Sequence, residues 1–297
     1  MPLESVQTIV QNALAGGYAL GYFESWNLES LQGVIDAAEQ TSSPIIVGFN
    51  GEFLSNSHSE RKDRIAWYAA LGRAAAESAS VPCGLIFNEC LRDNMNRLAV
   101  DVGFNCVMPA NPNTNYDDYL RVVADFTEYA HDRSVAVEAE LGELPCGSSG
   151  QINKTAAFTD PDLAAQFVEA TNVDLLAVSV GNIHVMVKGK QDLDLVKLAE
   201  IHRKVNVPLV LHGGTGISTA SLQKAISLGV AKVNYGTYIK QRYLKALREG
   251  LESECQDPHR LLGYGGDEDI MAVGCRTVCE AVLERIGFLG CCGKAKK

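Results

Sequence analysis

The chain has 297 residues, of which 46% are hydrophobic and 21% are charged, and its formal net charge at pH 7 is −10. This length allows one large α/β domain, and the acidic balance argues against a nucleic-acid partner and for a small ligand held in a local site. No run reaches the roughly 18 apolar residues of a membrane span, so we expect no membrane partner. We also expect no signal peptide, reduced thiols at the nine scattered cysteines, and a cytoplasmic location.

Short apolar runs alternate with longer amphipathic stretches along the chain. We expect strands at 19–23, 44–49, 82–87, 106–108, 136–141, 175–179, 208–212 and 232–235. The expected helices between them lie at 28–40, 61–78, 93–101, 117–133, 160–171, 193–204 and 218–228, with additional helices at 6–15 and 270–286.

Eight strands that alternate with helices predict a parallel sheet, and eight is the number that closes a (β/α)₈ barrel. We therefore expect a TIM barrel with extra N- and C-terminal helices, forming one domain over residues 1–297, with a doubly wound open sheet as the alternative. Barrel enzymes place their sites at the carboxyl ends of the strands. Those ends carry a polar residue in each case: Glu24, Asn50, Asn88 with Glu89, Asn111, Glu140, His184, His212 and Asn234.

The run from His212 to Gly216 reads His-Gly-Gly-Thr-Gly and follows an apolar strand. An imidazole can bind a cation, and glycine amides can hold a phosphate. A second imidazole, His184, follows another strand. Together they favour a metal-assisted enzyme that acts on a phosphorylated metabolite, whereas the run alone would also fit a glycine-rich turn with an incidental His.

The chain resembles the class II (metal-dependent) ketose-bisphosphate aldolases, the fructose- and tagatose-bisphosphate aldolase family. The resemblance runs nearly end to end. It is carried by Val-Glu-Ala-Glu-Leu-Gly at 137–142, Phe-Thr-Asp-Pro at 158–161, Leu-His-Gly-Gly-Thr-Gly-Ile at 211–217 and Lys-Val-Asn-Tyr-Gly-Thr at 232–237. It implies a TIM barrel that assembles as a homodimer or homotetramer.

The resemblance also implies a divalent metal, with Zn²⁺ first and Mn²⁺, Co²⁺ or Mg²⁺ as alternatives. In the family three His hold the metal, and a Glu is able to join them. His184 and His212 match two of the His, and Glu140 matches the Glu, either as a ligand or as a partner of a ligating His. The implied phosphate-binding residues are Gly181, Lys188, Gly213, Gly214, Thr215, Gly216, Asn234, Gly236 and Thr237.

One segment departs from the family, whose members carry Asp-His-Gly after the third strand. Asn88 stands at the position of the proton-transferring Asp, and Glu89 at the position of the remaining His ligand. An amide is no general acid or base in the usual pKa range, whereas a carboxylate can ligate a metal or take over proton transfer. Glu24, where the family has Asn, is another candidate base, so the expected catalytic residues are Glu89, Asn88, Glu24 and Asn234.

Three functions stay open. The leading hypothesis is a metal-dependent aldolase-type lyase that cleaves or forms a carbon–carbon bond in a phosphorylated ketose or related α-hydroxy ketone. We expect the substrate to differ from fructose 1,6-bisphosphate, because the changed residues surround the reacting carbons. The alternatives are a non-catalytic sugar-phosphate-binding paralogue and a metal-dependent isomerase or epimerase on the same scaffold.

Overall fold

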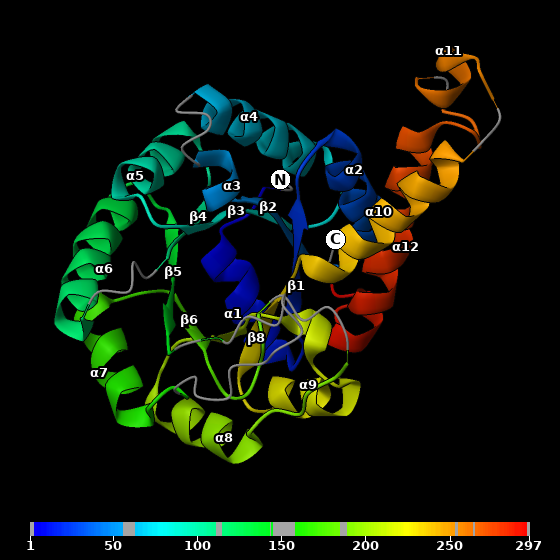
Figure 1. Ribbon diagram of the computed structural model, residues 1–297. Helices are drawn as coiled ribbons and strands as arrows, with labels where there is room; N and C mark the ends of the chain where they lie inside the picture. The colour runs from blue at the N-terminus through cyan, green and yellow to red at the C-terminus, as the bar shows by residue number, and fades with distance from the viewer. Residues whose placement is uncertain are drawn as a thin grey trace.

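The computed structural model describes residues 3–55, 63–110, 115–142, 144, 158–184, 189–252, 255–263 and 265–295. Within them the strands form a closed parallel barrel in chain order, which confirms the TIM barrel and excludes the open sheet (Figure 1). The strands are β1 (Leu20–Ser25), β2 (Ile45–Asn50), β3 (Cys83–Cys90), β4 (Cys106–Pro109), β5 (Ala136–Leu141), β6 (Leu175–Val178), β7 (Leu209–Leu211) and β8 (Val230–Tyr235).

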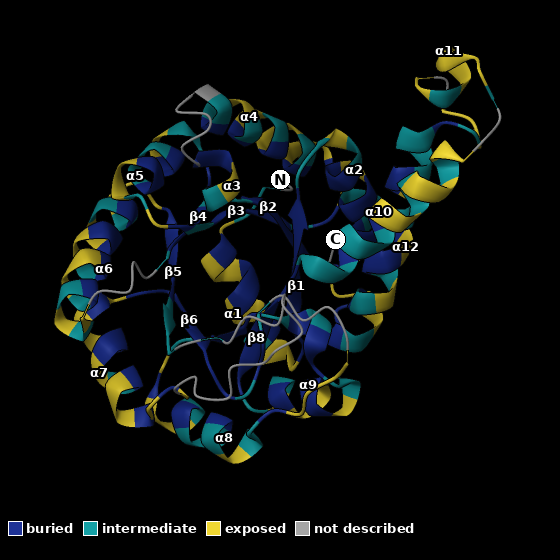
Figure 2. Ribbon diagram, viewed as in Figure 1, coloured by how far each residue is buried: buried dark blue, intermediate teal, exposed yellow. Residues whose placement is uncertain are grey.

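The helices form a ring around the barrel, with their buried faces toward the strands (Figure 2). They are α1 (Val6–Gly16), α2 (Leu28–Thr41), α3 (Gly51–Ser55), α4 (Asp63–Ser78), α5 (Asp93–Val102), α6 (Tyr116–His131), α7 (Pro161–Thr171), α8 (Leu195–Lys204), α9 (Thr219–Ile226), α10 (Thr237–Leu251), α11 (Pro258–Leu261) and α12 (Ile270–Leu289), with the 3₁₀ turn η1 at Gly214–Gly216. Every expected helix is present. Helices α3, α10 and α11 were not expected from the sequence, and α10 buries only Ile239 and Tyr243.

Helix starts follow the capping residues of the sequence. Asp160 precedes α7 and accepts hydrogen bonds from the N–H groups of Asp162 and Leu163, while Pro161 takes the first helical position. This start agrees with the helix expected at 160–171.

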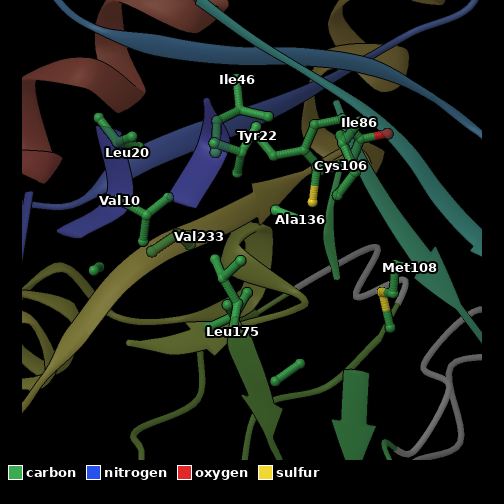
Figure 3. Close-up of a cluster of buried hydrophobic side chains, with 14 of the residues drawn as sticks. Val10, Leu20, Tyr22, Ile46, Ile86, Cys106, Met108, Ala136, Leu175 and Val233 are labelled. Atoms are coloured by element: carbon green, nitrogen blue, oxygen red, sulfur yellow. The ribbon is translucent and has the colours of Figure 1, made fainter. Parts of the chain in front are cut away.

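Helix α1 covers the amino end of the barrel. Leu3 pairs with Cys83, the first residue of β3, and a Cβ on Gly84 would lie only 2.5 Å from Val6. Figure 3 shows Val10 of the same helix beside Leu20 in the buried core. A cavity therefore opens at the other end of the barrel, where the carboxyl ends of the strands lie.

The C-terminal part extends the barrel on one side. Helices α10 and α12 pack on each other, and their far ends project away from the ring together with α11 (Figure 1). None of the helices in the described ranges has the length and apolar character needed to cross a membrane.

Candidate active site

A cavity of about 360 Å³ opens at the carboxyl ends of the strands. Ten of the residues predicted for the site line it: Glu24, Asn88, Glu89, His184, His212, Gly213, Thr215, Asn234, Gly236 and Thr237. Glu140 contacts His212 from beside the cavity, whereas Gly181, Gly214 and Gly216 lie in the turns around it without lining it. Lys188 lies outside the described residues, so its role in phosphate binding stays a prediction.

A β-bulge in β3 brings Asn88 and Glu89 to the same cavity. The pairing of β3 with β4 shifts between Phe87 and Cys90, and Glu89 has a φ of 58°, in the left-handed region. Successive side chains of a regular strand point to opposite faces, so two neighbours can share a cavity only where the strand is irregular. This conformation is strained for a residue with a side chain, and such strain is often found at functional sites.

His212 is the centre of the polar group in the cavity, and its side chain is only 1% exposed. Its Nε2 faces Glu138 Oε1 at 2.9 Å, while its Nδ1 faces Glu89 Oε1 at 3.2 Å and Glu140 Oε2 at 3.1 Å. His184 faces the same oxygen of Glu89, with 3.7 Å between Nε2 and Oε1. The structure thus brings together all four residues predicted as metal ligands.

The charged side chains around His212 shift one another's pKa values. Burial alone would lower the pKa of His212, but its contacts with three carboxylates raise it well above the usual value. Burial would likewise raise the pKa of Glu89, but the hydrogen bond and charge of His212 and the charge of His184 lower it to about 2. Glu89 also accepts a hydrogen bond from Asn50 Nδ2 at 3.1 Å, so it is a firmly held carboxylate.

A fully buried ion pair lies beneath His212. Lys232 and Glu138 are both 0% exposed, and Lys232 Nζ lies 2.8 Å from Glu138 Oε2. The same ammonium donates a hydrogen bond to Asn234 Oδ1 at 2.6 Å. One continuous network therefore joins Asn234 to the imidazole of His212.

Glu24 forms a second ion pair at the wall of the cavity. Its Oε1 lies 2.5 Å from Lys240 Nζ, and it packs so closely on Gly236 that a Cβ there would lie 2.2 Å from Oε2. Burial raises the pKa of Glu24, and the charge of Lys240 opposes this only in part. Glu24 is the cavity carboxylate whose proton affinity is increased rather than reduced.

The glycine loop after β7 and the start of α10 also border the cavity. Gly213 has a φ of 68°, and a Cβ at this position would lie 2.1 Å from the carbonyl oxygen of Ile183. Thr215 Oγ1 accepts a hydrogen bond from Tyr238 N at 3.2 Å, and Lys190 Nζ donates to Thr215 O at 3.0 Å. The positive end of the α10 dipole is directed at this part of the cavity, which Gly236 and Thr237 line, as an anion site requires.

As the side chains stand, the described residues contain no group of three or more His, Cys, Asp and Glu that could hold a metal ion. The donors around His212 Nδ1 contact one another instead. Their chemistry nevertheless fits a divalent cation: two carboxylates and two imidazoles are a zinc-type donor set, and Glu138 holds the far nitrogen of His212, as acceptors behind metal ligands do. Donors of one tetrahedral zinc lie about 3.4 Å apart, close to the contacts seen here.

Four residues of the site were not predicted from the sequence: Glu138, Lys232, Lys240 and Lys190. Strand periodicity could have found the first two, because Glu138 lies two residues before Glu140, and Lys232 two residues before Asn234, on the same strand face. Lys240 follows Thr237 on α10, a helix that the pattern did not reveal. No local pattern indicates Lys190, which bonds to a backbone carbonyl on another loop.

The chain is similar to known proteins over nearly its whole length. The chain is 32% identical to the fructose-bisphosphate aldolase of Geobacillus stearothermophilus, with 99% of each sequence covered. The crystal structure of the YdjI aldolase from Escherichia coli K12 superposes with a TM-score of 0.82 at 31% identity, covering 99% of this chain and all of that one. A putative fructose-1,6-bisphosphate aldolase from Coccidioides immitis gives the same TM-score at 25% identity, with 98% of each chain covered. Residues 4–294 match the family described as Fructose-bisphosphate aldolase class-II, and the chain belongs to that family.

Proposed function

We propose that the protein is a metal-dependent aldolase-type lyase that cleaves or forms a carbon–carbon bond in a phosphorylated ketose or related α-hydroxy ketone. The observation that carries the proposal is the gathering of His212, His184, Glu89 and Glu140 at one cavity that a glycine loop and a helix N-terminus also border. Family membership supports a metal-dependent aldolase. The changed residues Asn88 and Glu89 support a substrate other than fructose 1,6-bisphosphate.

We assign metal binding to His212 Nδ1, His184 and Glu89, with Glu140 as a further ligand or a partner of His212. When bound there, a divalent cation, Zn²⁺ first, would polarise the substrate carbonyl and stabilise the charge that bond cleavage leaves. Glu138 keeps Nδ1 of His212 turned to the cavity. The loop at Gly213 and Thr215 and the amides that begin α10 would hold the phosphate and fix the substrate in register.

We assign proton transfer to Glu24. Asn88 has no titratable proton, and the low pKa of Glu89 makes it a poor base but a good anionic ligand. Burial raises the pKa of Glu24 above its ordinary value, which is the direction that makes a carboxylate a better base. Lys240 holds its Oε1, so Oε2, on the side of Gly236, would be the oxygen that takes the proton.

The test is product analysis with purified protein and Zn²⁺, Mn²⁺ or Co²⁺, over a panel of ketose mono- and bisphosphates. We expect metal-dependent release of an aldehyde and a smaller ketone. Glu24→Gln should lose turnover while retaining phosphate binding, and Glu77→Gln on the exposed face of α4 is the matched control. Cleavage of no member by metal-loaded protein would refute the proposal, and isomers without fragments would indicate an isomerase or epimerase instead.

A further inference from the structure

Three buried polar atoms at the floor of the cavity have no hydrogen-bond partner among the described residues. They are Tyr22 Oη, Asn88 Oδ1 and Asn234 Nδ2, in side chains of residues that are 2%, 3% and 8% exposed. All three residues line the cavity. Buried polar groups are almost always paired in folded proteins, so three unpaired groups around one cavity indicate a polar ligand that pairs with them.

The barrel geometry brings these groups together. Tyr22 on β1 and Asn234 on β8 are Cα partners in the ladder, and Asn88 is the partner of Asn50 on β2, next to β1. Tyr22 and Glu24 share one face of β1, and Glu24 also lines the cavity. Figure 3 shows Tyr22 extending from the side of Leu20 toward Ile86 and Cys106, into the interior of the barrel.

The neighbours of the two amides fix which of their atoms is left for a ligand. Lys232 Nζ can only donate, so the Asn234 atom that it contacts is the oxygen, and Nδ2 remains as a donor. The carboxylate of Glu89 can only accept, so its hydrogen bond with Asn88 uses the amide nitrogen and leaves Oδ1 as an acceptor. The floor therefore offers one donor, one acceptor and one hydroxyl that does either.

We propose that Tyr22 is a substrate-binding residue. Its hydroxyl, together with Asn88 and Asn234, forms hydrogen bonds with the oxygens on adjacent carbons of a polyhydroxylated ketose phosphate. The inference rests on the proposed function, because it takes the phosphate to lie at the Gly213 loop. A carbonyl oxygen of the substrate accepts from Asn234 Nδ2, and a neighbouring hydroxyl donates to Asn88 Oδ1. Asn88 is thereby a binding residue, in place of a proton-transferring one.

The test compares Tyr22→Phe, which removes only the hydroxyl, with the wild type. Tyr235→Phe is the matched control. Tyr235 borders the same cavity, and its equally buried hydroxyl also has no partner among the described residues. Because Tyr235 follows the inward-facing Asn234 on β8, its ring lies on the outer face of the barrel, where it stacks on Phe23. The probes are dihydroxyacetone phosphate and inorganic phosphate, measured by titration calorimetry with Zn²⁺-loaded protein. Thermal unfolding of the ligand-free proteins serves as the independent measurement.

We expect Tyr22→Phe to weaken dihydroxyacetone phosphate binding about 10-fold or more and to leave phosphate binding unchanged, because only the former reaches the floor. Its ligand-free Tm should be equal to or above that of the wild type, since an unpaired hydroxyl contributes nothing to folding. A lowered Tm with unchanged affinity would show a structural role and overturn the inference, as would a wild type that does not bind dihydroxyacetone phosphate. Hydroxyl-dependent binding without turnover would overturn only the proposed function.

Discussion

Removal of the ammonium of Lys232 tests whether the buried network holds the site together. Lys232→Met keeps a long apolar side chain but leaves the Glu138 carboxylate, at a position that is 0% exposed, with His212 as its remaining positive partner among the described residues. It also removes the contacts of 2.8 Å to Glu138 and 2.6 Å to Asn234. Removing one partner of a buried ion pair costs about 3–5 kcal/mol, which is a large fraction of the stability of a typical domain.

The double variant Lys232→Met with Glu138→Gln separates the charge from the packing. The amide introduced by Glu138→Gln is neutral and can still accept from His212 Nε2, so we expect the double variant to be more stable than Lys232→Met alone. The three variants and the wild type form a double-mutant cycle, measured by urea unfolding near neutral pH. The reasoning is wrong if Lys232→Met costs less than about 1 kcal/mol, or if the two single losses simply add.

The single substitution Glu138→Gln tests the contribution of Glu138 to metal binding. Replacing the hydrogen-bond acceptor of a metal-binding His typically lowers the metal affinity about 10- to 100-fold. We expect a loss in this range for Zn²⁺, measured by competition with a chromophoric chelator, while secondary structure measured by circular dichroism is retained. Unchanged zinc affinity would show that His212 is oriented by other contacts.

Three further changes have separate outcomes. Gly213→Ala should lower stability by about 1–3 kcal/mol in thermal unfolding, because its φ of 68° is strained for alanine and the new methyl meets a carbonyl oxygen. Asp269→Asn should cost about 1–2 kcal/mol, because the Asp269 carboxylate accepts four backbone N–H groups. Those bonds hold the pKa of Asp269 below its ordinary value of 3.8, so the wild-type advantage in urea unfolding should be present above that pH and disappear as pH falls through the lowered pKa. Lys190→Met should raise KM for a phosphorylated substrate a few-fold at unchanged kcat, because it loosens the loop at Thr215.

The barrel was predictable because its strands are short apolar runs and its helices have regular spacing. α10 was not, since seven of its 15 residues are charged or polar and it buries only Ile239 and Tyr243. Such a helix is stabilised by its contacts with α12, which a single stretch of sequence does not contain.

The candidate site was predictable where residues follow strands and not where contacts cross the barrel. Glu140 lies near the carboxyl end of β5, and His212 and His184 follow β7 and β6, so the topology brings them to one face of the barrel. The bulge that turns Glu89 into the cavity has no glycine to mark it, and only its φ of 58° reveals it. Lys232 reads as part of an ordinary strand, although burial without any exposure and pairing with Glu138 make it a central residue of the site.

The net charge of the cavity favours binding of a cation first and of an anionic substrate afterwards. Among the described residues, the four carboxylates Glu24, Glu89, Glu138 and Glu140 face Lys232, Lys240 and a protonated His212, which leaves a net charge of −1 for this group. With a neutral His212 and a divalent cation the same group sums to zero. Because the charges lie in a buried site, this difference acts strongly on a phosphate group. Inorganic phosphate should therefore bind more tightly after Zn²⁺ is added than to chelator-treated protein, and equal affinity in both states would show that the carboxylates do not act through a cation.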